Sequence, residues 1–177
     1  ANGIASVELV EAMARARLLG FFGAAGLSPE RIESAIARLN HSLHGLPFGI
    51  NLIHSPNETD LETATVNLLL RHRIRLIEAS AYLRLTLPVV RYRVAGIARD
   101  AEGRIVTPNR IVAKVSRVEV ATQFFSPPPD ECLSELVRNG ELTQEQARLA
   151  AQIPMAQDVT AEADSAGHTD NRPLVTL

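Results

Sequence analysis

Short apolar runs alternate along this chain with longer segments whose apolar residues recur at helical spacing. Continuous apolar runs of this length are typical of strands that are buried on both faces. Strands of this kind, each followed by an amphipathic helix, indicate a parallel sheet with helices packed outside it. Five strands are predicted, at residues 18–22, 48–53, 75–80, 111–115 and 158–163.

The segments between these strands carry helix-start signals. Ser28 followed by Pro29 is typical of an N-cap and a first helical position, and residues 55–58, Ser-Pro-Asn-Glu, form a capping-box pattern. Further helices are predicted at about 86–94 and at 118–125. Each predicted strand but the last is thus followed by a helix.

Two later gaps between strands are longer than one helix requires. Residues 96–110 contain a hairpin-like turn at 100–103. Residues 126–153 contain three successive prolines and two short helices, the second of which opens with the capping-box pair Thr143 and Gln146. The sequence therefore predicts two insertions, and the second is helical.

Two architectures fit alternating strands and helices, a doubly wound sheet and an eight-stranded barrel. A doubly wound dinucleotide-binding domain normally carries a G-x-G-x-x-G turn, and the glycines at 20, 23 and 26 have the wrong spacing. A barrel needs eight strands and about 250 residues. The prediction is therefore an incomplete (β/α)8 barrel over residues 1–177, with a helical insertion at about 126–153. The chain starts without Met and stops within an apolar run, so we expect an internal segment of a longer protein.

The composition excludes several classes of protein. Apolar residues make up 46% and charged residues 21% of the chain, which is typical of a globular domain. No apolar run approaches the roughly 18 residues that span a bilayer. The 18 Lys and Arg are scattered and the net charge is −2, so we expect neither a nucleic-acid partner nor a membrane. Cys132 is the single cysteine, which leaves no disulfide framework, and a cytoplasmic location is expected.

Four polar residues interrupt the otherwise apolar strands near their C-terminal ends: Asn51, Glu78, Lys114 and Glu162. Burying such groups without partners costs several kcal/mol, so each needs a partner, a ligand or access to water. The C-terminal face of a barrel carries the active site. Two interpretations stay open: these residues form a site, or they pair with one another, as Lys114 could with Glu78 or Glu162.

The densest polar cluster, residues 164–172, follows the last predicted strand. Small residues before His168 would allow close backbone approach to a ligand, and its imidazole could serve as an acid or hydrogen-bond donor. The alternative is a solvated loop in which Asp170 or Asn171 caps the next helix. His54, after the strand at 48–53, could line a site or satisfy a turn. No histidine spacing matches a metal-binding motif, so no metal site is predicted.

Five segments together resemble the PfaD-type enoyl reductases: GFFGAAGLSPER, FGINLIHSPNE, RLIEASAYLRLT, PNRIVAKVSRVEVA and IPMAQDVTAEADSAGHTDNRPLVTL. These enzymes act in trans on polyunsaturated fatty acid and polyketide synthases. They belong with the nitronate monooxygenases and the flavin-dependent enoyl-acyl-carrier-protein reductases. The resemblance implies a barrel that carries FMN, is reduced by NAD(P)H and acts on enoyl chains held by acyl carrier protein. It also implies synthase components as partners. A homodimer is one oligomeric state that we expect for the complete protein.

The resemblance assigns roles to individual residues. It implies that His168 is catalytic, because it would hydrogen-bond the thioester carbonyl or supply the α-proton. The cofactor-binding residues that it implies are Asn51, Glu78, Lys114, Glu162, Ala166 and Gly167. Relatives generally carry Gly-Gly-His where this chain has Ala166-Gly167-His168, and the extra methyl would crowd a backbone approach that needs a positive φ.

In this register the predicted strands correspond to the second to the sixth of the barrel. The phosphate site of such barrels usually follows strands seven and eight, so we expect the isolated segment to lack the FMN phosphate anchor and to be inactive. Two other functions stay open. One is a nitronate monooxygenase-type flavin oxidase, and the other is a non-catalytic or docking segment.

Overall fold

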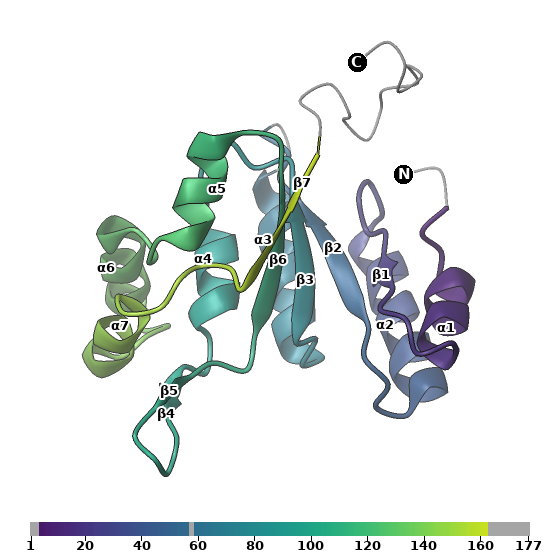
Figure 1. Cartoon of the computed structure of the whole chain (residues 1–177), viewed down its shortest axis with the longest axis horizontal. Helices are drawn as coiled ribbons and strands as arrows, with labels where there is room; N and C mark the ends of the chain where they lie inside the picture. The colour runs from purple at the N-terminus through teal and green to yellow at the C-terminus, as the bar shows by residue number, and fades with distance from the viewer. Residues whose placement is uncertain (1–3, 57–58, 163–177) are drawn as a thin grey trace.

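The computed structural model describes residues 4–56 and 59–162 (Figure 1). One parallel sheet contains five strands in the order β1, β2, β3, β6 and β7. Their bounds are Phe21–Phe22, Gly49–Ile53, Leu76–Ser80, Arg110–Val115 and Asp158–Ala161. Parallel strands that neighbour one another in sequence order are the arrangement of a (β/α)8 barrel, whereas a doubly wound sheet reverses its order at a switch point. The sheet is therefore an arc of a barrel, as the sequence predicts.

The first predicted strand is shorter than expected. Of the run at 18–22 only Phe21 and Phe22 join the sheet, because Leu18 and Leu19 are exposed in the loop that precedes it. Phe21 pairs with Gly49 of β2, and a Cβ at position 49 would lie 2.3 Å from the Phe21 ring. Glycine at this position lets the edge strand pack against its neighbour.

Seven helices occur in the described part of the chain, and α2, α3 and α4 pack in succession behind the sheet (Figure 1). Their bounds are α1 Val7–Arg15, α2 Pro29–Leu43, α3 Thr59–Arg71, α4 Leu87–Val94, α5 Val118–Phe125, α6 Asp130–Arg138 and α7 Gln144–Ala150. No helix in the described ranges is long and apolar enough to cross a membrane.

The predicted helices are present at the positions that the sequence gives. One helix was not predicted, and one predicted capping box is not fully described. The helix α1 was not predicted, although Ser6 caps it by accepting a hydrogen bond from the backbone N–H of Leu9, and Val10 and Ala14 bury one face. The capping box predicted at 55–58 includes residues 57 and 58, which lie outside the described residues. The capping box of Thr143 and Gln146 at α7 is present, with both reciprocal hydrogen bonds.

Both inserted segments contain the expected features. The first is a hairpin of two antiparallel strands, β4 (Ala98–Arg99) and β5 (Ile105–Val106), around the turn predicted at 100–103. The second contains α6 and α7. The buried Arg93 of α4 anchors the end of this second segment, because its Nε donates to the carbonyl of Pro154 at 3.0 Å and its Nη1 donates to that of Asn109 at 2.7 Å.

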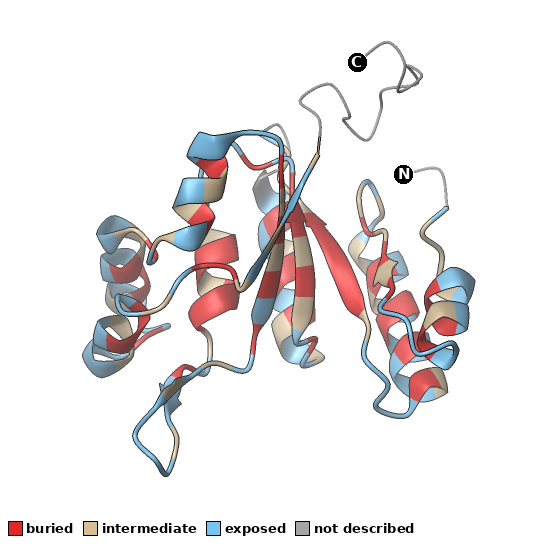
Figure 2. Cartoon of the chain, in the orientation of Figure 1, coloured by how far each residue is buried: buried red, intermediate tan, exposed pale blue. Residues whose placement is uncertain are grey.

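The two faces of the sheet differ in polarity. Ile50, Ile77 and Ile111 lie in one row across β2, β3 and β6, and all three are fully buried. Leu52, Ala79 and Ala113 form the next row on that face, which the helices cover (Figure 2). Successive side chains of a strand point to opposite faces, so the residues between these rows share the other face.

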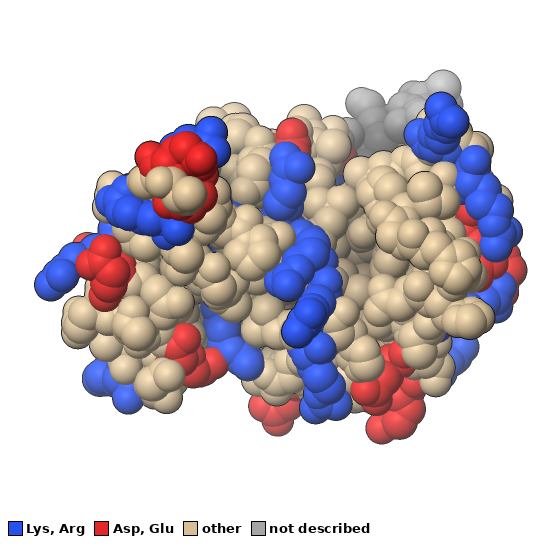
Figure 3. Space-filling model, turned by 90° about the horizontal axis from the view of Figure 1, so that it is seen from below, with Lys and Arg blue, Asp and Glu red and all other residues tan. Residues whose placement is uncertain are grey.

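The two ends of the strands also differ. Arg75 directly precedes β3, Arg110 begins β6, and both are exposed. Figure 3 views this N-terminal end of the strands, and a band of basic side chains crosses its middle. The acidic and amide side chains that the sequence singles out lie toward the opposite end.

An ion-paired network holds α1 against α2. Arg38 Nε and Nη2 each donate to a carboxylate oxygen of Glu11 at 3.1 Å, and Nη1 donates to Glu8 at 2.5 Å. The hydrogen bonds from Arg38 keep the pKa of Glu11 below its ordinary value of 4.5. Because the folded pKa is depressed, this contribution to stability is complete above the ordinary value and is lost as the pH falls through the folded value.

We therefore expect Arg38→Gln to lower the thermal midpoint at about pH 6 and to lower it less at about pH 3, because the contribution shrinks as the pH falls toward and through the depressed pKa of Glu11. Thermal unfolding followed by circular dichroism at both pH values measures this. Arg31→Gln is the matched control, because Arg31 is exposed on the same helix and forms no ion pair among residues 4–56 and 59–162. An equal loss for Arg38→Gln at both pH values would contradict the electrostatic explanation.

Candidate functional site

Polar side chains gather on the face of the sheet that the helices do not cover. Asn51 of β2 pairs in register with Glu78 of β3, and two residues further along β3 lies Ser80. Lys114 of β6 pairs with Thr160 of β7 on the same face. The structure thus brings together three strand residues that the sequence predicts, and it adds Ser80.

The carboxamide of Asn51 links β2 to β3. Its Nδ2 donates to Ser80 Oγ at 2.8 Å and to Glu78 Oε2 at 3.1 Å. Asn51 is 7% exposed, and its Oδ1 accepts no hydrogen bond from the described residues. These bonds fix the orientation of the amide.

Lys114 forms an ion pair at the same end of the sheet. Its Nζ lies 3.3 Å from Glu162 Oε2, and the two side chains are 23% and 26% exposed. Glu162 follows β7, and its backbone N–H donates to the Val115 carbonyl at 2.9 Å. Both side chains line a small pocket of about 80 Å³, together with Tyr82. The pairing that the sequence left open is therefore present, and it lies at the wall of a cavity.

Lys114 is the single lysine of the chain, whereas the other 17 of its 18 basic residues are arginines. An ammonium is a compact point charge, and a guanidinium is a planar fork with five donors. A lysine at this position places a localised positive charge at the small pocket that it lines.

A second polar cluster lies beside the first, around Glu62 of α3. Glu62 Oε2 is 2.8 Å from His54 Nδ1, and Glu62 Oε1 accepts hydrogen bonds from the hydroxyls of Tyr82, at 2.9 Å, and of Thr86. Burial, followed by the charge of Glu62, holds the pKa of Tyr82 well above its ordinary value. The sequence singled out His54 but not its partners, since their contact depends on how α3 packs.

Three of the predicted site residues, Ala166, Gly167 and His168, lie outside the described residues, and their assignment stays a prediction from the resemblance. Lys114 and Glu162 lie at the C-terminal end of the sheet, whereas Asn51 and Glu78 lie at the middle of β2 and β3. All four have polar partners within the protein, so a structural role and a ligand-binding role remain compatible with their positions.

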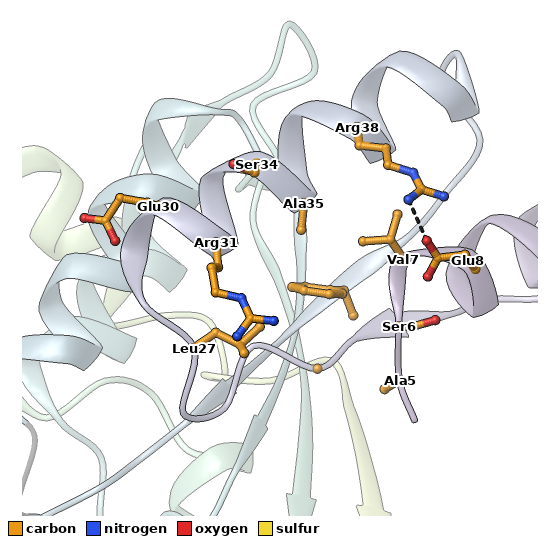
Figure 4. Close-up of a pocket in the computed structure, with 12 residues that line it drawn as sticks. Ala5, Ser6, Val7, Glu8, Leu27, Glu30, Arg31, Ser34, Ala35 and Arg38 are labelled. Carbon is orange, nitrogen blue, oxygen red and sulfur yellow. Dashed lines mark hydrogen bonds and ion pairs between the residues drawn. The ribbon is translucent and has the colours of Figure 1, made fainter. Parts of the chain in front are cut away.

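A separate pocket of about 570 Å³ lies between α2 and the segment that leads into α1 (Figure 4). Phe22, Leu27 and Arg31 line it, and Figure 4 shows Arg38 directed at Glu8 beside it. The Arg38 guanidinium is occupied by the carboxylates of α1, and none of the predicted site residues that the structure describes borders this cavity. It lies beside β1, at the edge of the sheet opposite β7.

The strand order defines a segment of a (β/α)8 barrel. Comparison with known proteins shows which barrel proteins this chain is similar to. The chain aligns with the crystal structure of the enoyl reductase domain of MlnA, from the macrolactin biosynthesis cluster of Bacillus amyloliquefaciens. The TM-score is 0.88 at 38% identity, over 99% of this chain and 40% of that one. A scan against models of protein families finds no match.

Curated sequences agree with the structural match. The chain is 47% identical, over 98% of its length, to a component of the polyunsaturated fatty acid synthase of Thraustochytrium sp., and it covers 12% of that protein. It is 44% identical, over 99% of its length, to the polyketide biosynthesis protein PksE of Bacillus subtilis, of which it covers 23%. The resemblance to PfaD-type enoyl reductases is thereby confirmed. The chain is similar to a segment of the enoyl reductase-like domains associated with polyketide and polyunsaturated fatty acid synthases.

The Asn51 contact with Glu78 generates a stability prediction. Asn51→Asp keeps the shape of the side chain but replaces a donor by a carboxylate facing Glu78 Oε2, so we expect a loss of about 2 kcal/mol in the free energy of unfolding near pH 7. Urea denaturation measures the loss. Glu78→Gln in the Asn51→Asp background should recover most of it, because one carboxylate then faces an amide. A double variant as unstable as Asn51→Asp would show that charge repulsion is not the cause.

Proposed function

We propose that the protein to which this chain belongs reduces enoyl thioesters carried by an acyl carrier protein, with FMN and NAD(P)H as cofactors. The observation that carries this proposal is the match to the enoyl reductase domain of MlnA over 99% of the chain. The names of the curated relatives support polyketide or fatty acid synthase components as partners. The chain spans 40% of the MlnA domain chain and less of those relatives, so the activity is proposed for the longer protein.

The donor set at the polar end of the sheet fits a flavin ring. An isoalloxazine presents carbonyl oxygens and ring nitrogens that accept hydrogen bonds, and one N–H that donates. The chain offers the fixed carboxamide of Asn51 and the ammonium of Lys114 on one face of the sheet. When bound there, FMN would supply the hydride that saturates the β-carbon of the enoyl chain, and NAD(P)H would renew it.

The residues of this chain would act by orientation and by charge. Lys114 would stabilise negative charge that develops beside it, and Glu162 would hold the ammonium in place. Asn51, oriented by Glu78 and Ser80, would fix a bound ring by hydrogen bonding. The resemblance assigns the proton that reaches the α-carbon to His168, which would also hydrogen-bond the thioester carbonyl.

The direct test uses the full-length protein under anaerobic conditions, with NADPH or NADH and a crotonyl thioester. We expect a flavin absorbance band, oxidation of the nicotinamide and formation of the butyryl thioester. Oxygen-dependent oxidation of a nitronate without thioester reduction would favour the oxidase alternative. Absence of flavin from the full-length protein would reject the proposal, and His168→Ala should lower reduction while flavin stays bound.

A second test concerns the charge of Lys114. We expect Lys114→Met to lower kcat/KM about a hundredfold, because it removes electrostatic stabilisation from a partly enclosed site, with the fold retained. Lys114→Arg should recover only part of the loss, since a planar guanidinium does not reproduce the position of the ammonium. Arg148→Met, on the exposed surface of α7, is the matched control. A Lys114→Met enzyme with unchanged kcat/KM would exclude this role.

A further inference from the structure

Glu62 is a buried carboxylate without a basic Lys or Arg partner among residues 4–56 and 59–162. It is 4% exposed, and its two oxygens contact His54, Tyr82 and Thr86. An ionised carboxylate at this depth needs several donors. The three partners of Glu62 come from different elements: His54 from the end of β2, Tyr82 from the loop after β3 and Thr86 from the start of α4.

His54 is held in position on several sides. Its backbone N–H donates to the carbonyl of Ser80, the last residue of β3, at 3.1 Å. Its ring stacks on Tyr82, with centroids 5.3 Å apart and planes inclined by 26°. Nδ1 is bonded to Glu62. The imidazole therefore has one defined orientation. A histidine that only completed the hydrogen bonds of a turn would not need all three contacts.

The second ring nitrogen is left available. No hydrogen bond joins Nε2 of His54 to any described residue, and the side chain is 13% exposed. Ser42 Oγ is the single buried side-chain polar atom of the described part that lacks a partner, so Nε2 is not sealed in the interior. When a carboxylate holds one nitrogen of a histidine, it fixes the direction in which the other nitrogen acts.

The cluster adjoins the pocket of Lys114. Tyr82 stacks on His54 on one side and lines, with Lys114 and Glu162, the pocket of about 80 Å³ on the other. Phe124 packs edge-on against Tyr82, with centroids 5.9 Å apart. Phe124 is 0% and Tyr82 5% exposed, so both rings belong to the core, and the imidazole of His54, 13% exposed, lies at the edge of this cluster.

We propose that His54 is a further substrate-binding residue, whose Nε2 hydrogen-bonds a polar group of the thioester arm, an amide or a carbonyl, and that Glu62 positions it. This inference rests on the proposed enoyl reductase function. It assigns His54 to substrate affinity and leaves the transfer of hydride and proton to other groups.

Two substitutions of His54 separate the two nitrogens. Asparagine places its amide near the position of Nδ1, so His54→Asn keeps a donor for Glu62 and removes Nε2. Glutamine reaches the position of Nε2, so His54→Gln keeps that group and loses the bond to Glu62. A binding role predicts that asparagine is the more harmful to substrate affinity, and a purely structural role predicts that glutamine is the more harmful to stability and that affinity is unaffected.

The experiment uses the full-length protein loaded with its cofactor. We expect His54→Asn to raise KM for crotonyl-pantetheine about tenfold, the loss typical of one hydrogen bond, with kcat within about twofold. Calorimetric titration with butyryl-pantetheine, which cannot be reduced, should show the same increase in Kd. Glu62→Gln should raise Kd to a smaller extent, because the amide can still accept from Nδ1.

Thr86→Val is the matched control, since it removes a donor from Glu62 without touching His54. It should lower the thermal midpoint and leave Kd unchanged. Equal Kd values for His54→Asn and the parent would overturn the inference, as would a Kd increase of equal size in Thr86→Val. A parent protein that neither holds flavin nor reduces the thioester would instead reject the proposed function, and this inference with it.

Discussion

The alternation of side chains in β2, β3 and β6 is the constraint on which the rest of the structure depends. Each of these strands must bury one row of apolar side chains beneath the helices. Ile77 and Ala79 do so in β3, where both are fully buried, while Glu78 lies between them on the opposite face. A shift of the register by one residue would exchange the two faces. The same alternation that builds the core therefore sets the polar groups side by side.

Neighbouring strand-helix units are joined by polar contacts as well as by the ladder of the sheet. Asn51 connects β2 to β3 through Glu78 and Ser80, and Glu62 of α3 connects the end of β2 to the loop before α4. Both connections lie toward the C-terminal end of the strands. Because donors and acceptors of neighbouring units satisfy one another, the loops at this end are held in one arrangement.

Most of the fold follows from local patterns that the sequence displays. The continuous apolar runs predict β2, β3 and β6 closely, because helices and neighbouring strands bury most of these residues. The capping pair of Thr143 and Gln146 predicts the start of α7 for the same local reason. The helix α1 was missed even though Ser6 and its apolar face carry a signal. The apolar run at 18–22 predicted a five-residue strand, whereas only Phe21 and Phe22 pair with the sheet.

The site was only partly predictable, because its chemistry depends on contacts between distant elements. Asn51 and Lys114 are conspicuous as polar residues in apolar strands, and both lie where that reasoning places them. Glu62 sits on an amphipathic helix among other polar residues, and only the packing of α3 shows that it is buried. Ser80 is an ordinary strand-end residue and Tyr82 an ordinary loop residue in the sequence. Only the folded structure shows that they contact Asn51 and His54.

Two acidic side chains at this end of the sheet, Glu78 and Glu62, have hydrogen-bond partners other than Lys114. Glu78 faces the amide of Asn51, and Glu62 faces two hydroxyls and an imidazole, so neither consumes the ammonium of Lys114. Glu78 and Glu62 thus contact groups other than Lys114, whose ammonium pairs with the partly exposed Glu162 at the small pocket. The two side chains of this pair are 23% and 26% exposed, so the pair is neither sealed in the core nor fully solvated. Its position follows from the register that places Lys114 beside Thr160 of β7, two residues before Glu162.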